Sequence, residues 1–273
     1  MSTPPRAPAS PPAICNVDGK PVSVDDLLPL ALTNVGHFTS MRVDSDGTIR
    51  GLTLHMERLA RDCKIVWHAA LDTDRVCEYV RQALQGQNHP CVVRVTIYDP
   101  KVEMGHPADA NEPHVLVSVR GAGALPPVPL RAQSVLYERD LPQVKHVGLF
   151  GALHTRGAAQ RADFDDALFV GRDGFVSEGG TWNVAFVDQE GTVVWPDAPV
   201  LPGVTMALLQ QQVEHRTATV TLEQAKGMAA AFATNTSIGV RPLAAIDDTE
   251  FPVEHPVLTR LQEAYLSIPG ETL

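Results

Sequence analysis

Four short apolar runs in the second half of the chain constrain its fold more than any other feature. Each run is three or four residues long, and the connections at 171–174 and 188–191 both end in glycine. Four-residue connections that end in glycine are typical of β-hairpins. The runs at 168–170, 175–177, 184–187 and 192–195 are therefore predicted to form an antiparallel part of a sheet.

The rest of the chain mixes strand and helix periodicities, which predicts an α/β (α+β) fold. Strands are predicted at 14–17, 22–24, 37–43, 48–51, 91–98, 114–120, 229–234 and 240–246, with a tight turn at Asp18-Gly19 between the first two. Helices are predicted at 54–68, 72–84, 205–215 and 256–266, with a further helical turn opened by the capping box Thr221-x-x-Gln224. A helix of small residues is expected after Lys145.

Proline and glycine concentrate at residues 121–130, and this composition marks a domain boundary. We expect a small N-terminal α/β domain at 13–120 and a larger domain at 131–273, joined by a linker at 121–130. Residues 1–12 are rich in proline and contain almost nothing that could be buried. They are expected to form a disordered tail.

The composition is that of an ordinary globular protein and argues against several kinds of partner. A formal net charge of −10, with 20% charged residues, argues against nucleic acid and an anionic membrane as partners, because both require a basic surface. No stretch approaches the roughly 20 apolar residues that span a bilayer. The four cysteines include no C-x-x-C pair, so neither a metal site nor a disulfide framework is indicated, and a cytoplasmic location is expected.

Lys145 differs in setting from the other lysines of the chain, of which there are five in all. The others lie beside a turn, in a loop, near a helix end or among polar helix neighbours, whereas Lys145 lies between Val144 and Val147. Apolar surroundings lower the pKa of an ammonium group, as an amine that forms a Schiff base requires. Taken alone, the pattern also fits a surface lysine with a buried stem.

Glu178 directly follows the second apolar run and is itself followed by Gly179, Gly180 and, at the next strand, Asn183. A carboxylate in this place can keep the nitrogen of a pyridine ring protonated, so that the ring withdraws electrons from a reacting carbon. Taken alone, the same residues also fit a turn at the end of a strand.

Three segments can bind a phosphate. The segment before the helix at 205–215 directs the backbone N–H groups of Val204 and Thr205 towards an anion at the helix N-terminus. The turn after the strand at 229–234 offers Thr236 and Ser237, and the helix at 54–68 offers Arg58 for charge-assisted hydrogen bonds.

The order of Lys145, small-residue helix, hairpin and Glu178-Gly-x-x-x-Asn183, with His55-x-x-Arg58-Leu upstream, resembles the pyridoxal-phosphate enzymes of fold type IV, the class IV aminotransferases. The resemblance extends from about residue 37 to residue 246. It implies a two-domain fold with a mixed-sheet pseudo-barrel in the larger domain, and a homodimer in which the partner completes each site. It implies that Lys145 is the internal aldimine lysine of pyridoxal 5′-phosphate, Glu178 the partner of the pyridine nitrogen, and the phosphate ligands Arg58, Val204, Thr205, Thr236 and Ser237.

The chain departs from the family where the family binds substrate. D-amino-acid aminotransferases of this fold hold the substrate carboxylate with a tyrosine and an Arg-x-His, where this chain has Phe38 and Met104-Gly-His106. Phe38 resembles the residue found at this place in the branched-chain branch of the family. That branch has a tyrosine where this chain has Phe150, and the lyase branch lacks that tyrosine. These residues predict an apolar pocket, with Phe38, Arg42, Met104 and His106 as candidate substrate-binding residues.

The resemblance implies an aminotransferase that moves an amino group from an amino acid or primary amine to a keto acid. The same residues also fit a lyase that releases pyruvate from aminodeoxychorismate, since both reactions break the bond between substrate Cα and its hydrogen. A relative that has kept the fold without catalysis is the third possibility, and the presence of Lys145 and Glu178 argues against it.

Overall fold

The computed structural model describes residues 14–273, and the predicted tail at 1–12 lies outside them. The elements are β1 (Ile14–Val17), β2 (Lys20–Pro21), α1 (Val24–Thr33), β3 (His37–Val43), α2 (Leu52–Trp67), α3 (Thr73–Leu84), β4 (Cys91–Tyr98), η1 (Pro107–Asp109), β5 (His114–Gly121), β6 (Leu130–Leu136), α4 (Phe150–Arg161), β7 (Asp166–Val170), β8 (Val176–Gly179), β9 (Asn183–Val187), β10 (Val193–Pro196), α5 (Val204–Gln212), β11 (His215–Ala218), α6 (Leu222–Lys226), β12 (Ala230–Asn235), β13 (Gly239–Ile246), β14 (Thr249–Glu250) and α7 (Pro256–Ser267).

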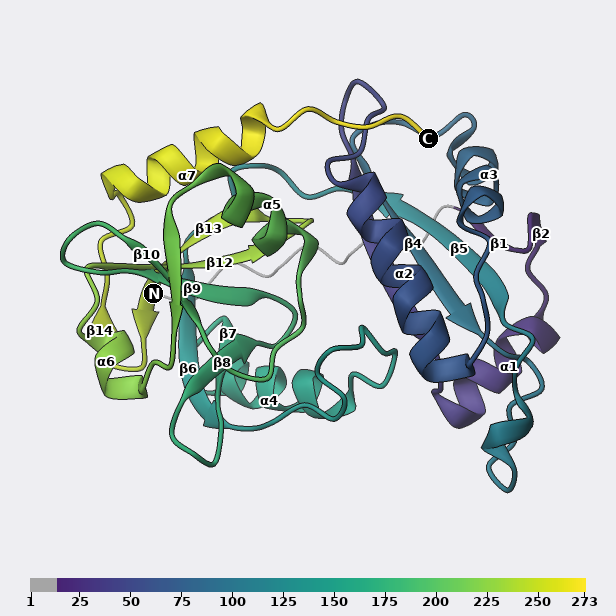
Figure 1. Ribbon diagram of the computed structural model, residues 1–273, viewed down its shortest axis with the longest axis horizontal. Helices are drawn as coiled ribbons and strands as arrows, with labels where there is room; N and C mark the ends of the chain where they lie inside the picture. Colours follow the sequence, from purple (N-terminus) through teal and green to yellow (C-terminus); the bar gives the residue numbers. More distant parts are fainter. Residues whose placement is uncertain (1–13) are drawn as a thin grey trace.

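The first five strands form one antiparallel sheet in the order β2-β1-β5-β4-β3, which with α1–α3 makes up a small lobe, residues 14–121 (Figure 1). One face of this sheet packs against α2 and α3 and forms the core, which includes Met41, Val93 and Val117. Side chains alternate along a strand, so Phe38, Ser40, Arg94 and Arg120 share the opposite face.

The remaining strands form a mixed sheet in a large lobe, residues 130–267 (Figure 1). Parallel pairs join β13 to β6 and β6 to β7, while β7, β8 and β9 pair in antiparallel fashion. The pairing of β8 with β9 closes six strands into a barrel, so the expected mixed sheet and pseudo-barrel are confirmed. Helices α5 and α7 cover one side of the barrel and α4 packs on β7.

The change of sheet between β5 and β6 falls in the segment 121–130. We propose, as the sequence predicts, that this segment is the linker between two domains.

Two strand predictions are wrong. Residues 22–24 are not a strand, because a capping box starts α1 there: the Ser23 hydroxyl accepts a hydrogen bond from Asp26 N, and the Asp26 carboxylate accepts one from Ser23 N. Residues 48–51 do not pair with β3. They follow a turn in which Asp44 N donates to Thr48 O at 2.9 Å, and Gly51 has a φ of +71° where α2 begins.

The helix predicted at 205–215 ends earlier, at Gln212. His215 begins β11, a short strand parallel to β10. Within residues 14–273, no helix is long and apolar enough to cross a membrane, and no group of three or more His, Cys, Asp and Glu side chains is arranged to hold a metal ion.

Candidate active site

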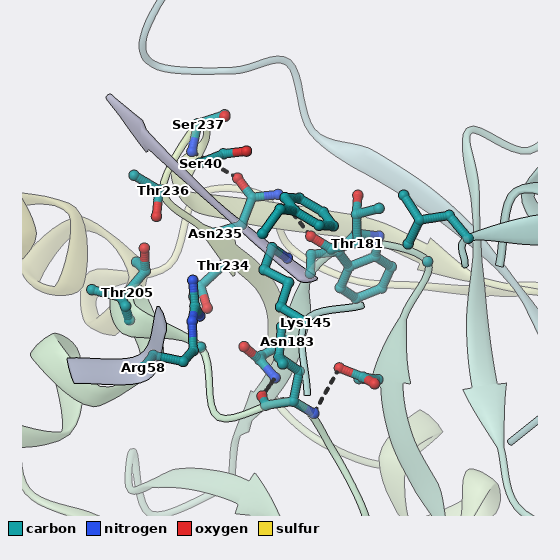
Figure 2. Close-up of a pocket in the computed structure, with 18 of the residues that line it drawn as sticks. Ser40, Arg58, Lys145, Thr181, Asn183, Thr205, Thr234, Asn235, Thr236 and Ser237 are labelled. Carbon is teal, nitrogen blue, oxygen red and sulfur yellow. Dashed lines mark hydrogen bonds between the residues drawn. The ribbon is translucent and has the colours of Figure 1, made fainter. Parts of the chain in front are cut away.

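A cavity of about 220 Å³ lies between the two lobes and contains most of the candidate residues. The small lobe contributes Phe38, Ser40 and Arg58 to its lining, and the large lobe contributes Lys145 and Glu178. Figure 2 shows the side chain of Lys145 extending into the middle of the cavity. The predicted phosphate ligands Arg58, Val204, Thr205, Thr236 and Ser237 all line it.

The backbone of Lys145 is held from both sides. Its carbonyl accepts a hydrogen bond from Phe38 N at 2.8 Å, and its own N–H donates to Asp62 Oδ2 of α2 at 3.0 Å. Its Nζ lies 4.9 Å from the centre of the Phe38 ring, and no hydrogen bond or ion pair within residues 14–273 holds it. The amine is therefore free to react.

The pKa of Lys145 is lowered to about 7, chiefly by burial and in addition by the nearby guanidinium groups of Arg58 and Arg139, while Glu178 opposes them. An ammonium loses its proton more readily when it is removed from water and placed near other cations. At neutral pH much of the population of Lys145 is consequently the uncharged amine, which is the nucleophilic form.

Glu178 lies on β8 and is only 3% exposed. Its Oε1 accepts a hydrogen bond from Arg139 Nη1 at 3.1 Å, and its Oε2 accepts one from Leu201 N at 3.2 Å. Burial raises the pKa of Glu178, and the Arg139 guanidinium and the Leu201 N–H counteract that rise. The carboxylate is thus fixed in place and lies on the cavity wall.

Asn183, directly opposite Glu178 in the pairing of β8 with β9, supports the same wall. Its Nδ2 donates to Leu201 O at 2.8 Å. Gly203 leaves room for this amide, since a Cβ at residue 203 would lie 2.1 Å from Asn183 Oδ1. The Glu-Gly-x-x-x-Asn spacing therefore brings carboxylate and amide to the same loop, 201–203.

Unpaired polar groups gather around Arg58. Its Nη2 donates to Thr39 Oγ1 at 2.8 Å and its Nη1 to Pro202 O at 3.4 Å. Within the described chain, Arg58 Nε and Thr234 Oγ1 are buried without a hydrogen-bond partner. Burial lowers the pKa of Arg58 to about 10. A buried cation beside free donors and the N-terminus of α5 fits a phosphate, because the anion supplies the missing acceptors.

His55, which sequence reasoning did not single out as a site residue, braces this group. Its Nδ1 lies 2.7 Å from Thr39 Oγ1 and its Nε2 3.5 Å from Thr236 Oγ1. The ring therefore connects the small lobe to the turn at 235–237 of the large lobe. The sequence feature that could have indicated His55 as a site residue is its place at the start of the His-x-x-Arg-Leu pattern.

Arg94 and Arg120 also line the cavity and were not predicted. The guanidinium carbon of Arg94 lies 3.6 Å from the centre of the Phe38 ring, and its Nε donates to Thr96 Oγ1 at 3.2 Å. The pKa of Arg94 is lowered to about 10, first by burial and second by the charge of Arg120. In residues 14–273 no carboxylate pairs with either. A single charged residue within the apolar strand β4 was the signal that could have revealed Arg94.

Three of the four predicted substrate residues lie elsewhere. Arg42 binds Asp44 Oδ1 at 3.2 Å and Gly123 O at 2.9 Å. Met104 is 85% exposed, and it and His106 lie in the loop before η1, outside the lining of this chain's cavity. Phe38 alone of the four lines it.

Comparison with known proteins agrees with this geometry. The chain matches the model of the amino-transferase class IV family over residues 36–246. It is similar to the T.th. branched-chain amino acid aminotransferase in complex with N-(5′-phosphopyridoxyl)-L-glutamate, with 20% identity, 93% of each chain covered and a TM-score of 0.82.

Two further solved structures are similar. The Escherichia coli branched-chain amino acid aminotransferase has 19% identity, 96% coverage of each chain and a TM-score of 0.82. A putative 4-amino-4-deoxychorismate lyase of Legionella pneumophila has 22% identity, covers 90% of this chain and 95% of its own, and has a TM-score of 0.79. No curated protein matches the chain significantly.

Proposed function

Because the chain belongs to the class IV aminotransferase family, whose cofactor is pyridoxal 5′-phosphate, we propose that it is an aminotransferase that uses Lys145 as its reactive amine. The observation that carries the proposal is the free amine of Lys145 between the cationic group at Arg58 and the buried carboxylate of Glu178. When bound, pyridoxal phosphate supplies an aldehyde that condenses with amines and a ring that withdraws electrons.

The residues of the cavity divide the work of binding the cofactor. Arg58 and the hydroxyls of Thr205, Thr236 and Ser237 would bind the phosphate, together with the N–H groups of Val204 and Thr205 at the start of α5. Glu178 would accept a hydrogen bond from the ring nitrogen and keep it protonated. Arg139 assists by holding Glu178 in its charged form.

Lys145 has two tasks. Its uncharged amine would hold the aldehyde carbon of the cofactor, with the aldehyde oxygen released as water, until an amino donor takes its place. The freed amine would then act as the base that accepts the proton from the substrate Cα and as the acid that gives a proton back. A pKa of about 7 suits this exchange, because a general base and acid works best when its pKa is near the working pH.

Arg94 and Arg120 point to the acceptor. Two arginines on one face of the sheet repel each other unless an anion lies between them. We assign them to the carboxylate of a 2-oxo acid and, in the return reaction, of the amino acid. The expectation of an apolar donor rested on Phe38, Met104 and Phe150, and of these only Phe38 lines the cavity of its own chain.

We also propose a homodimer with a shared site. Apolar side chains are exposed on α1, where Val24 is 75% and Leu32 73% exposed, and on α4 at Phe150. Met104 and His106, remote from the cavity of their own chain, are assigned to the partner's site. Sedimentation of the wild type and of Phe150→Asp tests this; a monomer with full activity contradicts it. The four free cysteines fit a reducing compartment, and we place the enzyme in the cytoplasm.

The test is a half-reaction screen. Single amino acids and amines are added to the yellow holoenzyme, and conversion of the visible band to the amine form is followed. Conversion that a 2-oxo acid reverses supports transamination, and Arg94→Gln should raise KM for the acid about tenfold or more, in keeping with the loss of a charge-assisted hydrogen bond.

Other outcomes contradict the proposal. Pyruvate released from aminodeoxychorismate without any conversion by other donors identifies the lyase. A chain that binds no cofactor at all identifies a non-catalytic relative. Borohydride reduction that labels a lysine other than Lys145 removes the assigned role of that residue.

A further inference from the structure

The last six residues, 268–273, leave α7 of the large lobe and cross to the small lobe (Figure 1). We call this segment the C-terminal strap. It is a second connection between the lobes, in addition to the linker at 121–130. Its end reaches the small-lobe core, against which Leu273 packs.

The strap docks on the loop that precedes α2. Ile49 N donates to Glu271 O and Glu271 N to Ile49 O, both at 2.9 Å. Gly270 permits this close approach, because a Cβ at that residue would lie 1.8 Å from Thr48 Oγ1. Two backbone hydrogen bonds and a glycine without spare room define one docked position.

Glu271 also caps α2 from a distance. The N-cap residue of α2 is Gly51, which has no side chain to accept a hydrogen bond from the first turn. The Glu271 carboxylate takes that place: Oε2 accepts from Thr53 N at 3.1 Å and from the Thr53 hydroxyl. A negative charge at a helix N-terminus is also favoured by the helix dipole.

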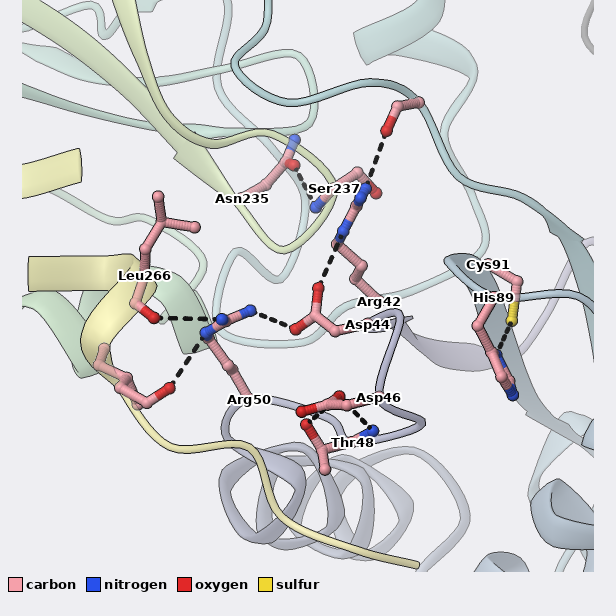
Figure 3. Close-up of polar contacts among 12 residues, drawn as sticks. Arg42, Asp44, Asp46, Thr48, Arg50, His89, Cys91, Asn235, Ser237 and Leu266 are labelled. Carbon is pink, nitrogen blue, oxygen red and sulfur yellow. Dashed lines mark hydrogen bonds and ion pairs between the residues drawn. The ribbon is translucent and has the colours of Figure 1, made fainter. Parts of the chain in front are cut away.

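Arg50 adds a second attachment, which Figure 3 shows. Its Nε donates to Ile268 O at 3.1 Å and its Nη2 to Leu266 O at 3.2 Å, while its Nη1 pairs with Asp44. Asp44 in turn holds Arg42, whose Nη1 donates to Gly123 O of the linker. Both connections between the lobes are thus attached to the same loop, 44–51.

This loop leads directly into α2, which carries one of the residues proposed to bind the phosphate. Arg58 lies on α2, less than two turns after Leu52, and the other ligands lie on the large lobe. Gly51 touches the start of α5, since a Cβ there would lie 2.8 Å from Val204 Cγ1. Helix α7, from which the strap leaves, packs against α5 through the same apolar cluster as Val204.

We infer that the strap positions α2, with Glu271 as the positioning residue, so that Arg58 reaches a phosphate bound at the start of α5. The inference rests on the proposed function, because it concerns the phosphate half of that cofactor site. Glu271 contacts neither the cavity nor its ligands. It acts through the N-terminus of α2.

The experiment titrates full-length apoprotein with pyridoxal 5′-phosphate and, separately, with pyridoxal, which lacks the phosphate. Glu271→Ala should weaken binding of the phosphate compound about tenfold, equivalent to about 1.4 kcal/mol, and leave the affinity for pyridoxal within about twofold. Glu271→Gln keeps an acceptor oxygen and should recover most of the loss. Thr272→Ala, at an exposed neighbour in the strap, is the matched control.

A double-mutant cycle separates positioning from general destabilisation. In the Arg58→Ala background, Glu271→Ala should change the affinity for pyridoxal phosphate less than twofold, because the group that it positions is gone. Gly270→Ala, which forces the strap off Thr48, should reproduce the loss if Glu271→Ala proves too unstable to purify.

Three results overturn the inference. They are an equal loss of affinity for pyridoxal phosphate and pyridoxal in Glu271→Ala, an undiminished effect of Glu271→Ala in the Arg58→Ala background, or wild-type affinity in both Glu271→Ala and Gly270→Ala. A wild-type protein that binds neither compound rejects the proposed function instead, so the two failures are distinguishable.

Discussion

Replacing Lys145 by methionine should make the apoprotein more stable at neutral pH. Methionine has a similar length and carries no charge, so it keeps the packing and removes a buried amine that must be desolvated. Burial lowers the pKa of Lys145, so the folded protein binds this proton less tightly than the unfolded chain does. The charged lysine therefore lowers the free energy of unfolding.

The magnitude follows from the pKa of Lys145, which falls from the ordinary value of 10.5 to about 7. At about 1.4 kcal/mol for each tenfold change in acidity, this corresponds to a cost on the order of 5 kcal/mol. Relaxation of the protein and penetration of water reduce the real cost of a buried charge, so we expect a gain of roughly 2–3 kcal/mol for Lys145→Met at pH 7.

The sign of the pH dependence is fixed by the same shift. Below about pH 7 the lysine is protonated in both states, and the cost is fully present. Between about pH 7 and 10.5 only the unfolded chain keeps the proton, so the stability of the wild type rises with pH. The advantage of the methionine variant should therefore shrink as the pH approaches 10.5.

Urea unfolding of both apoproteins at several pH values between 6 and 10 measures the difference, and other titrating groups cancel in the comparison. Lys64→Met, on the exposed side of α2, is the control and should change stability by less than about 0.5 kcal/mol. A methionine variant that is less stable than the wild type, or a gain that stays constant over this range, would refute the electrostatic reasoning.

Two further substitutions test the wall beside Glu178. Arg139→Gln should lower the free energy of unfolding in urea by about 3 kcal/mol, because it leaves the buried Glu178 carboxylate without its counter-ion. Adding Glu178→Gln to the same chain should restore most of that loss. An unchanged stability of the single variant contradicts this. Gly203→Ala should lower stability by about 1–3 kcal/mol and weaken cofactor binding, since the new methyl group displaces the Asn183 amide. Gly105→Ala is the control and should be neutral, because open space surrounds Gly105. Equal effects of the two substitutions would show that the contact at Asn183 is unimportant.

The residues that sequence could identify are those whose chemistry is visible in their local context. Lys145 has apolar neighbours, and Glu178 and Asn183 lie at the two ends of one short turn, so spacing alone predicts that they meet. Apart from Arg58 on α2, the proposed phosphate ligands come from a helix start and a turn, which are both local patterns. The hairpins from β7 to β10 were predicted for the same reason, since their connecting turns are short.

The residues that sequence missed depend on contacts between distant segments. Arg94 and Arg120 reach the cavity because the register of β4 and β5 places both on the open face of the small sheet. Arg139 pairs on the cavity wall with Glu178, a residue 39 positions away in the sequence. Residues 48–51 form no strand with β3 because Ile49 pairs with Glu271, a partner more than 200 residues away that no local pattern reveals.

The cavity is strongly cationic although the chain is acidic. Its lining includes four arginines and Lys145 against the single carboxylate of Glu178, while the whole chain has a formal net charge of −10. At physiological ionic strength, charges more than about 8 Å apart in solvent are largely screened, so the acidic surface hardly affects an anion once it has entered the cavity. There the dielectric constant is lower and the nearby arginines dominate the potential.

The same arginines help to lower the pKa of Lys145, so binding of a phosphate and a carboxylate should raise that pKa again. Ligand binding and the protonation state of the reactive amine are thereby coupled, and an apoprotein that has bound inorganic phosphate should react more slowly with pyridoxal at pH 7.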